Sequence, residues 1–235
     1  MSEKVEFQQA QDAAIILGYG GLNQSIVKGL NKLKPPGITN SVITVEQFRQ
    51  AFAVQLLGGG SISTITYGGN YLTGDSEGQS VLKSRAYHKT KTTEDRCYLN
   101  EFDFFMCDLA TDVNSGFQVS KHEIGEADNN GVYSFSGEMI LNGAVATFAI
   151  HKTNTAMVIA PDAAGDKLTM PGATFIADGI KAGDTVILEG VTAGEDNLKQ
   201  VKVAELSETE LTFTCMNSLT AQATGSEFTI HAGRF

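Results

Sequence analysis

Two glycines near the N-terminus have the spacing that suggests cofactor chemistry most directly. The segment AAIILGYGGLNQSIV places Gly18-x-Gly20 after an apolar run and before a helix-like pattern, as in a dinucleotide-binding turn. The third glycine of that motif is replaced by Asn23, and antiparallel strand patterns follow instead of a second strand–helix–strand unit. A turn that uses glycine for positive φ angles is the favoured interpretation, and a dinucleotide-binding enzyme is kept as an alternative.

Histidines and cysteines form no recognisable catalytic or metal-binding pattern. The four histidines lack metal-ligand spacing, and we expect ordinary surface histidines at His88, His122, His151 and His231. We expect Cys97 and Cys107 to be buried free thiols. An odd count of three cysteines, completed by Cys215, favours synthesis in a reducing cytoplasm. The sequence therefore predicts no catalytic residue, no metal and no cofactor.

Acidic residues are dense in the middle of the chain, at Glu94, Asp95, Glu101, Asp103, Asp108 and Asp112. They could form a solvated face or a negative surface that repels a passing partner. They could also include a catalytic carboxylate pair. The segment DNNG at 128–131 is a weak calcium-loop candidate, because the expected glutamate does not follow it.

Composition and charge narrow the class of protein. The chain has 235 residues, 42% of them hydrophobic and only 19% charged, so we expect a folded core. The net charge is −10, and it is uneven: +2 over residues 1–90 and −12 over residues 91–235. Such a chain is a poor candidate for gripping a phosphate backbone. The longest apolar runs, at 13–17 and 144–150, are too short to span a membrane, and no secretory signal is visible.

The first ninety residues predict helices and one long hairpin. Ile26, Leu30 and Leu33 recur at helical spacing, which predicts a helix over 24–34. The pattern over 41–67 fits two strands joined by a turn at the glycines 58–60. A short helix is predicted over 76–87.

The remainder of the chain predicts antiparallel strands. A strand region is expected over 97–109, and the segment 116–124 pairs with 132–141 through the turn cluster 125–131. The segment 144–151 is expected to close a second hairpin. We predict a core domain over 1–155, a linker over 156–169, and a small all-β barrel or sandwich over 170–235.

The order of these patterns resembles the tail tube proteins, or major tail proteins, of long-tailed bacteriophages. The resemblance covers about residues 40–151. It lies in the 41–67 hairpin, in GGNYLTGD followed by GQSVL, and in the segments FFMCDLATD and GEADNNGVYSFSGEM. Residues 170–235 resemble the small β-module often attached to phage virion proteins.

The resemblance implies a fold and an assembly. The fold would be mainly β, an antiparallel β-sandwich or open barrel with a flanking helix and a long hairpin. Six copies would form a ring, and rings would stack into a hollow tube through which DNA passes without tight binding. Further partners would be the tail tip or baseplate, the tail terminator and the tape-measure protein. The protein would be made in the host bacterial cytoplasm and reside in the virion tail, with no enzymatic activity and no membrane contact.

Several residues follow as candidates within this hypothesis. Candidates for the lumen are Glu46, Glu101 and Asp103, the last two on one strand face. Candidates for hairpin contacts between subunits are Phe48, Phe52, Ile62 and Ile65, and candidates for a mobile loop are Gly68, Gly69 and Gly74. We expect the C-terminal module outside the tube, so that deletion of 170–235 leaves rings intact. Alternatives are another virion or secretion-tube component and a β-rich module that binds surface glycans.

Overall fold

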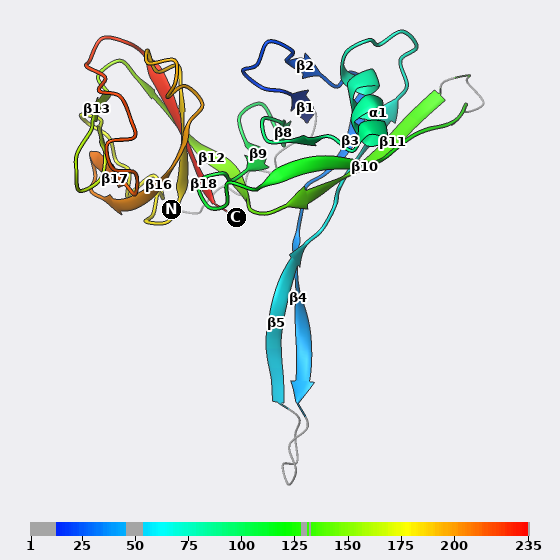
Figure 1. The fold of residues 1–235 in the computed structure, drawn as a ribbon, viewed down its shortest axis with the longest axis horizontal. Helices are drawn as coiled ribbons and strands as arrows, with labels where there is room; N and C mark the ends of the chain where they lie inside the picture. The colour runs from blue at the N-terminus through cyan, green and yellow to red at the C-terminus, as the bar shows by residue number, and fades with distance from the viewer. Residues whose placement is uncertain (1–12, 46–53, 128–130, 132, 235) are drawn as a thin grey trace, which may run out of the picture.

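Antiparallel strands make up 47% of the structure, and one helix lies among the described residues. The computed structural model describes residues 13–45, 54–127, 131 and 133–234. Figure 1 shows an N-terminal body, residues 13–154, beside a C-terminal module, residues 155–234, with a long hairpin projecting from the body. The expected mainly β fold with a flanking helix is confirmed.

The body consists of two sheets, the hairpin and the helix. Its elements are β1 (Ala14–Leu17), β2 (Ser25–Ile26), β3 (Leu30–Lys34), β4 (Ile38–Val45), β5 (Val54–Ile62), β6 (Ile65–Asn70), α1 (Gly78–His88), β7 (Lys91–Thr92), β8 (Arg96–Tyr98), β9 (Phe104–Cys107), β10 (Gly116–Ala127), β11 (Tyr133–Asn142) and β12 (Val145–Asn154). One sheet has the order β3-β6-β11-β10-β7 and belongs to the body alone.

The other sheet runs through body and module. The module adds β13 (Val158–Ala160), β14 (Lys167–Thr169), β15 (Thr185–Glu189), β16 (Gln200–Leu206), β17 (Glu210–Phe213) and β18 (Phe228–Arg234). The sheet order is β13-β14-β17-β16-β15-β18-β12-β9-β8-β1-β2. Strand β12 is the connection, because it pairs with β9 of the body on one side and with β18 of the module on the other.

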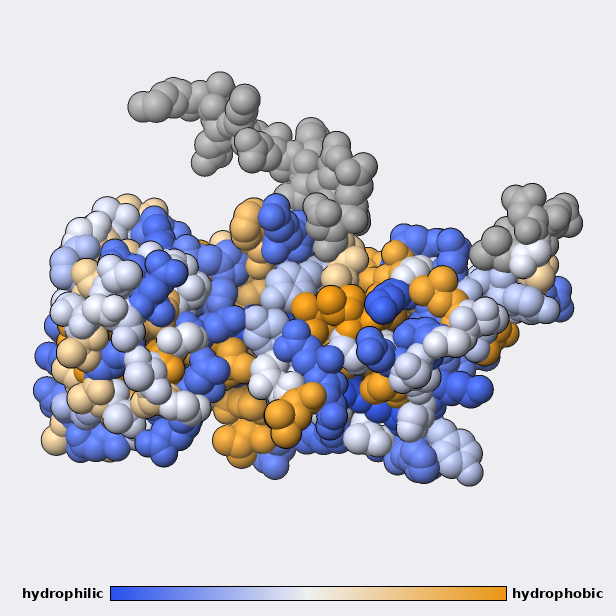
Figure 2. Space-filling model, turned by 90° about the horizontal axis from the view of Figure 1, so that it is seen from above, coloured by the Kyte–Doolittle hydropathy of each residue, from blue (hydrophilic) through white to orange (hydrophobic). Residues whose placement is uncertain are grey.

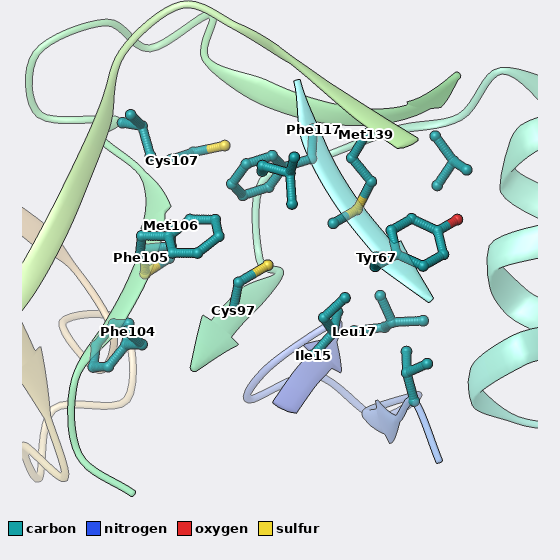
Figure 3. Close-up of a cluster of buried hydrophobic side chains, with 14 of the residues drawn as sticks. Ile15, Leu17, Tyr67, Cys97, Phe104, Phe105, Met106, Cys107, Phe117 and Met139 are labelled. Carbon is teal, nitrogen blue, oxygen red and sulfur yellow. The ribbon is translucent and has the colours of Figure 1, made fainter. Parts of the chain in front are cut away.

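An apolar cluster between the two sheets forms the core of the body. Figure 3 shows Ile15 and Leu17 of β1 and Cys97 of β8 on one side, and Phe117 and Met139 of β10 and β11 on the other. Buried residues alternate along β6, β10 and β11, so each strand turns one face to this core. Each fully buried large side chain contributes about 1.5–3 kcal/mol to folding.

Helix α1 covers one side of the body and is fixed by a buried amide. The side chain of Gln79 donates hydrogen bonds to the carbonyls of Lys28 (2.8 Å) and Asn70 (3.0 Å) and accepts one from the amide of Leu72 (3.1 Å). At the start of the helix, the carboxylate of Asp75 accepts the amide of Gln79 at 2.7 Å. This helix confirms the prediction over 76–87 to within one or two residues.

The module has its own core, which begins earlier than the sequence predicts. Met157, Ile159 and Leu168 are buried in it, and β13 and β14 are strands of its sheet. The segment 156–169 is therefore part of the folded module instead of a linker. A cut before residue 170 would also remove β18, which pairs with β12 from Thr147 to Asn154. The expectation that this deletion leaves rings intact stays a prediction, and the deletion would expose the edge of β12 that β18 covers.

Three local predictions differ from the structure. Residues 24–34 form β2 and β3, since a register shift between Leu30 and Lys32 places Leu30 and Leu33 toward the core at a helix-like spacing. The glycines 58–60 lie within β5 and therefore do not form the hairpin turn, and residues 46–53 lie outside the described residues. Strand β12 does not close a hairpin with β11. After a turn at Gly143 (φ +90°), it crosses to the other sheet.

Candidate assembly interface

Strands β4 and β5 form a ribbon that leaves the body and pairs with no other described strand. Figure 1 shows it pointing away from both sheets. Its base is closed by two hydrogen bonds, from the Ser63 amide to the Gly37 carbonyl (2.8 Å) and from the Gly37 amide to the Ser63 hydroxyl (2.8 Å). At about 3.4 Å per residue, the strands extend for roughly 30 Å. A two-stranded ribbon of this kind is barely stable alone, so its open edges favour pairing with another chain.

The register of the ribbon is given by its paired positions. Ile43 lies opposite Leu56, and Val45 lies opposite Val54. Opposite residues of an antiparallel pair share a face, and residues two apart on a strand share it too. These four positions therefore belong to one side of the strand register.

The five-stranded sheet has one face packed on the core and one uncovered polar face. Two rows cross this uncovered face, Lys34–Thr66–Glu138–Lys121 and Lys32–Gly68–Ser136–Glu123, each built from directly paired residues. Gly68 and Ser136, in the middle of the second row, carry small side chains, and a shallow hollow of about 410 Å³ lies over this part of the face. The face is therefore a shallow trough with charged margins and one carboxylate, Glu138, on its central strand.

The charges on this face are mixed. The two rows carry three lysines and two glutamates. Lys121 forms an ion pair with Glu123 at 2.9 Å, and this contact raises the pKa of Lys121. The face differs in this respect from the anionic surface that the net charge of the chain suggests.

Both margins of the five-stranded sheet have open strand edges. Strand β3 pairs only with β6 among the described strands. Strand β10 pairs with β7 only at Phe117 and Gln118, so from Val119 to Ala127 no further strand lies beside it in the described chain, and helix α1 is the element that packs against it. Two different open edges on one sheet permit head-to-tail pairing between copies, which closes into a ring when the rotation allows.

A second polar constellation lies at the seam between body and module. Arg96 of β8 is buried, and its guanidinium lies 3.5 Å from the centre of the Tyr19 ring and 4.5 Å from that of Phe104. It donates to Glu189 of β15 at 3.0 Å, and the Tyr19 hydroxyl donates to the same carboxylate at 2.6 Å. His231 of β18 also contacts Glu189, at 3.0 Å.

These contacts determine how the groups at the seam ionise. Burial alone would raise the pKa of Glu189, but hydrogen bonds from His231 and Tyr19 and the charge of Arg96 outweigh it and lower the pKa to about 2. Burial and the bond to Glu189 raise the pKa of Tyr19. Glu189 is therefore a carboxylate at neutral pH, and it neutralises the buried Arg96.

A second buried link ties the module to the end of β9. Lys202 of β16 contacts the Asp108 carboxylate at 3.0 Å, and the Thr185 hydroxyl donates to it at 2.9 Å. Gln200 accepts the amide of Leu109 (2.8 Å) and donates to the carbonyl of Cys107 (2.9 Å). Body and module are therefore joined by side-chain bonds as well as by the shared sheet.

Comparison with known proteins gives structural likeness only. No protein-family model matches the chain, and no curated protein matches it. A chain from the tail of an empty gene transfer agent particle with C6 symmetry is 17% identical, with a TM-score of 0.47 over 61% of this chain and all of that one. A chain from the anti-feeding prophage baseplate is 9% identical, with a TM-score of 0.46 over 60% of this chain and 97% of that one. The Dit (gp 19.1) protein of SPP1 is 8% identical, with a TM-score of 0.34 over 88% of this chain and 93% of that one.

The structure distributes the candidate assembly residues over different places. Glu46, Phe48 and Phe52 lie outside the described residues. Ile62 ends β5 and packs partly against the body core. Ile65 lies in β6 and is completely buried, which removes it from the candidates for contact with another subunit.

The remaining candidates are the two acidic residues expected in the lumen and the three glycines expected in a mobile loop. Glu101 and Asp103 lie in the bend between β8 and β9, not on one strand face, and the Asp103 carboxylate accepts from Asn100 (2.9 Å). Gly68 and Gly69 are buried within β6 rather than in a loop. Gly74 lies in a turn with φ +87°, as a loop position would.

The geometry gives little support to a dinucleotide site at Gly18 or to a solvated acidic face at Asp95. Gly18 lies in a turn between the antiparallel strands β1 and β2, and its amide donates to the buried Asp95 at 2.9 Å, so no helix follows as a dinucleotide site requires. Asp95 also binds Arg85 at 2.6 Å, which makes it a structural group instead of part of a solvated face. Within the described ranges, no group of three potential metal ligands occurs, and no helix there is long and apolar enough to cross a bilayer.

The seam residues Arg96 and Glu189 were not among the sequence candidates. They lie 93 positions apart, and no local pattern of the sequence points to either of them.

Proposed function

We propose that this chain is a non-enzymatic structural subunit of a phage tail that assembles into stacked six-membered rings forming the tail tube. The observation that carries the proposal is the five-stranded sheet with two different open edges and an uncovered polar face. Pairing the β3 edge of one copy with the β10 edge of the next would extend this sheet around a closed ring. The number six comes from the sequence resemblance.

In such a ring, the uncovered polar face would line the bore. A bore that passes DNA must offer few free cations, because each contact between a lysine and a phosphate adds affinity. Gly68 and Ser136 in the middle of one row, Glu138 in the other and the Lys121–Glu123 ion pair suit that requirement, and the other two lysines, Lys32 and Lys34, lie at the β3 margin. This assignment replaces Glu101 and Asp103 as lumen candidates with the two rows across the sheet.

The ribbon β4–β5 would make the contacts between stacked rings. It projects from the body, and its two strands pair with no other described strand, which leaves edges that a neighbouring subunit could cover. The module would lie outside the tube. In the view of Figure 2, its surface is mostly hydrophilic or neutral, while apolar residues gather over the middle of the molecule.

Electron microscopy of the concentrated protein tests the proposal. We expect rings and tubes of one diameter from the full chain. In the test variant, residues 39–61 are replaced by a two-residue Asn-Gly turn. This turn links Ile38 to Ile62, which are already paired, and keeps the Gly37–Ser63 bonds. This variant should stay folded and form no tubes, whereas Met216→Ser on the exposed surface of the module should still form them.

Two results would contradict the proposal. One is a full chain that remains monomeric at every concentration, and the other is a variant without the ribbon that assembles as the full chain does. Rings that form but do not stack would instead indicate a ring component of a baseplate or hub.

A further inference from the structure

Two histidines face each other across the seam between body and module. His151 of β12 lies directly opposite His231 of β18 in the strand register, and their Nδ1 atoms are 2.7 Å apart. Two ring nitrogens at this distance form a hydrogen bond only when one carries a proton and the other does not. The contact therefore requires one proton between the rings, neither none nor two.

The outer ring nitrogens each meet a carboxylate. His231 Nε2 lies 3.0 Å from Glu189, and His151 Nε2 lies 3.4 Å from Asp103. An ionised carboxylate only accepts, so both Nε2 atoms must donate. Three protons on the four ring nitrogens then satisfy all three contacts, and the pair carries one positive charge. The shorter bond to Glu189 places that charge on His231.

The surrounding charges balance in this three-proton state. Arg96 and a charged His231 are matched by Glu189 and Asp103. The ring of Phe104 fills the space beside both histidines, with ring centres 6.0 Å and 5.4 Å away. The charged groups that face the pair are Arg96 from β8, Asp103 from the β8–β9 bend and Glu189 from β15. Behind them, the hydroxyl of Tyr19 binds Glu189 and that of Tyr98 accepts from Arg96. A fourth proton would place two imidazolium ions together beside Arg96.

We propose that His151 and His231 form a proton-controlled latch between body and module, closed by three protons and opened when His151 binds a fourth in mild acid. The fourth proton would break the Nδ1–Nδ1 bond and loosen β18 from β12 at this position. The inference does not depend on the proposed tail function.

The direction in which the pKa of His151 is shifted agrees with a neutral His151 in the three-proton state. Burial and the neighbouring His231 charge lower the pKa of His151 below its ordinary 6.5, so it is neutral at pH 7. A histidine with a lowered pKa in the folded state binds more protons when the structure opens. Its stabilising contribution is therefore complete above pH 6.5 and is lost as the pH falls below that value.

Neighbouring contacts would confine the opening to the seam. Thr153 and Thr229 share a hydrogen bond at 2.6 Å, and Lys152 forms an ion pair with Asp178 at 2.8 Å. Neither contact involves a histidine. The latch would thus change the angle or mobility of the module rather than release it.

Nitrogen NMR of the histidine rings in the unmodified full chain tests the proton count directly. At pH 7 we expect three protonated ring nitrogens in the pair, with one Nδ1 bare. Between pH 6.5 and 5, the fourth should become protonated while the resonances of β12 and β18 shift. Two rings that titrate independently near pH 6.5, with no change in these strands, would overturn the proposal.

Hydrogen exchange measured by mass spectrometry tests the opening. After correction for intrinsic rates, protection of peptides from β12 and β18 should fall by up to about tenfold per pH unit below pH 6.5. Peptides from β16 and β17, which contain no histidine, should keep their protection. Equal loss in all four strands would mean general unfolding and would overturn the latch.

A matched pair of variants separates this latch from other titrating groups. His151→Asn keeps a polar atom near the Nδ1 position and cannot bind the fourth proton, so the pH dependence of β12 and β18 should disappear. His88→Asn, at the exposed end of α1, should leave it unchanged. Persistence of the effect in His151→Asn would refute the assignment. If that variant does not fold, the NMR titration of the unmodified chain decides.

Discussion

The guanidinium of Arg96 lies 3.0 Å from the carboxylate of Glu189, and this bond joins β8 of the body to β15 of the module. Arg96 is 1% exposed and held between the rings of Tyr19 and Phe104. A cation this deeply buried depends on its carboxylate partner. The packing of the module against the body is therefore tied to one ion pair.

Glu189→Gln should destabilise the protein strongly. It leaves the buried Arg96 without a counter-charge, at a cost of about 3 kcal/mol. Urea unfolding at pH 7 measures the loss. The comparison variant is Glu210→Gln, whose exposed ion pair with Lys167 spans 3.5 Å and contributes less than about 1 kcal/mol. Similar losses in the two variants would argue against a buried charge at the seam.

Acid should remove the contribution of Glu189 in a defined range. Its pKa is about 2 in the folded chain and 4.5 ordinarily, so the unfolded state binds more protons between these values. The stabilisation is complete above pH 4.5 and declines as the pH falls towards 2. The stability difference between the unmodified chain and Glu189→Gln should shrink over this range in urea titrations. A difference that stays constant from pH 5 to 2.5 would exclude this ionisation.

Gly69→Ala should be destabilising, although Gly69 fitted a mobile loop in the sequence. A Cβ atom at Gly69 would lie 1.9 Å from the carbonyl oxygen of Gly29, so the strands would have to separate. We expect a loss of about 3 kcal/mol in thermal or urea unfolding. Gly194→Ala, with no atom within 4 Å of the new Cβ and no left-handed φ, should change stability by less than about 0.5 kcal/mol. A mobile loop would instead make Gly69→Ala neutral or stabilising.

The three thiols should differ in reactivity. Burial raises the pKa of Cys107 to about 12 and that of Cys97 well above its ordinary value, so neither forms a thiolate at pH 8. A thiol-specific chromogenic reagent should label only the partly exposed Cys215 in the native chain and all three cysteines in denaturant. Rapid labelling of two or three thiols without denaturant would show that the body core is open.

The body strands could be predicted from the sequence because their buried residues alternate. Phe117 and Val119 of β10, and Phe135 and Met139 of β11, follow the two-residue period of a half-buried strand. The same rule fails in β3, where the bulge after Leu30 puts two core-facing leucines three residues apart. Periodicity alone does not distinguish this spacing from a helical turn.

The seam could not be predicted, because its contacts join distant parts of the chain. Arg96 meets Glu189 across 93 residues, and His151 meets His231 across 80. Local patterns carry no information on such pairings. The two open edges of the five-stranded sheet could not be predicted either, because they depend on which strands lack a neighbouring strand in the folded chain.

Strand β12 has a mechanical consequence. It contacts β9 within the body and β18 within the module, so no flexible tether separates the two parts. A force applied to the module would reach the phenylalanines of β9 through hydrogen bonds of one sheet. Body and module should then tilt together as one lever, and any bending between them would have to shear β12 against a neighbouring strand.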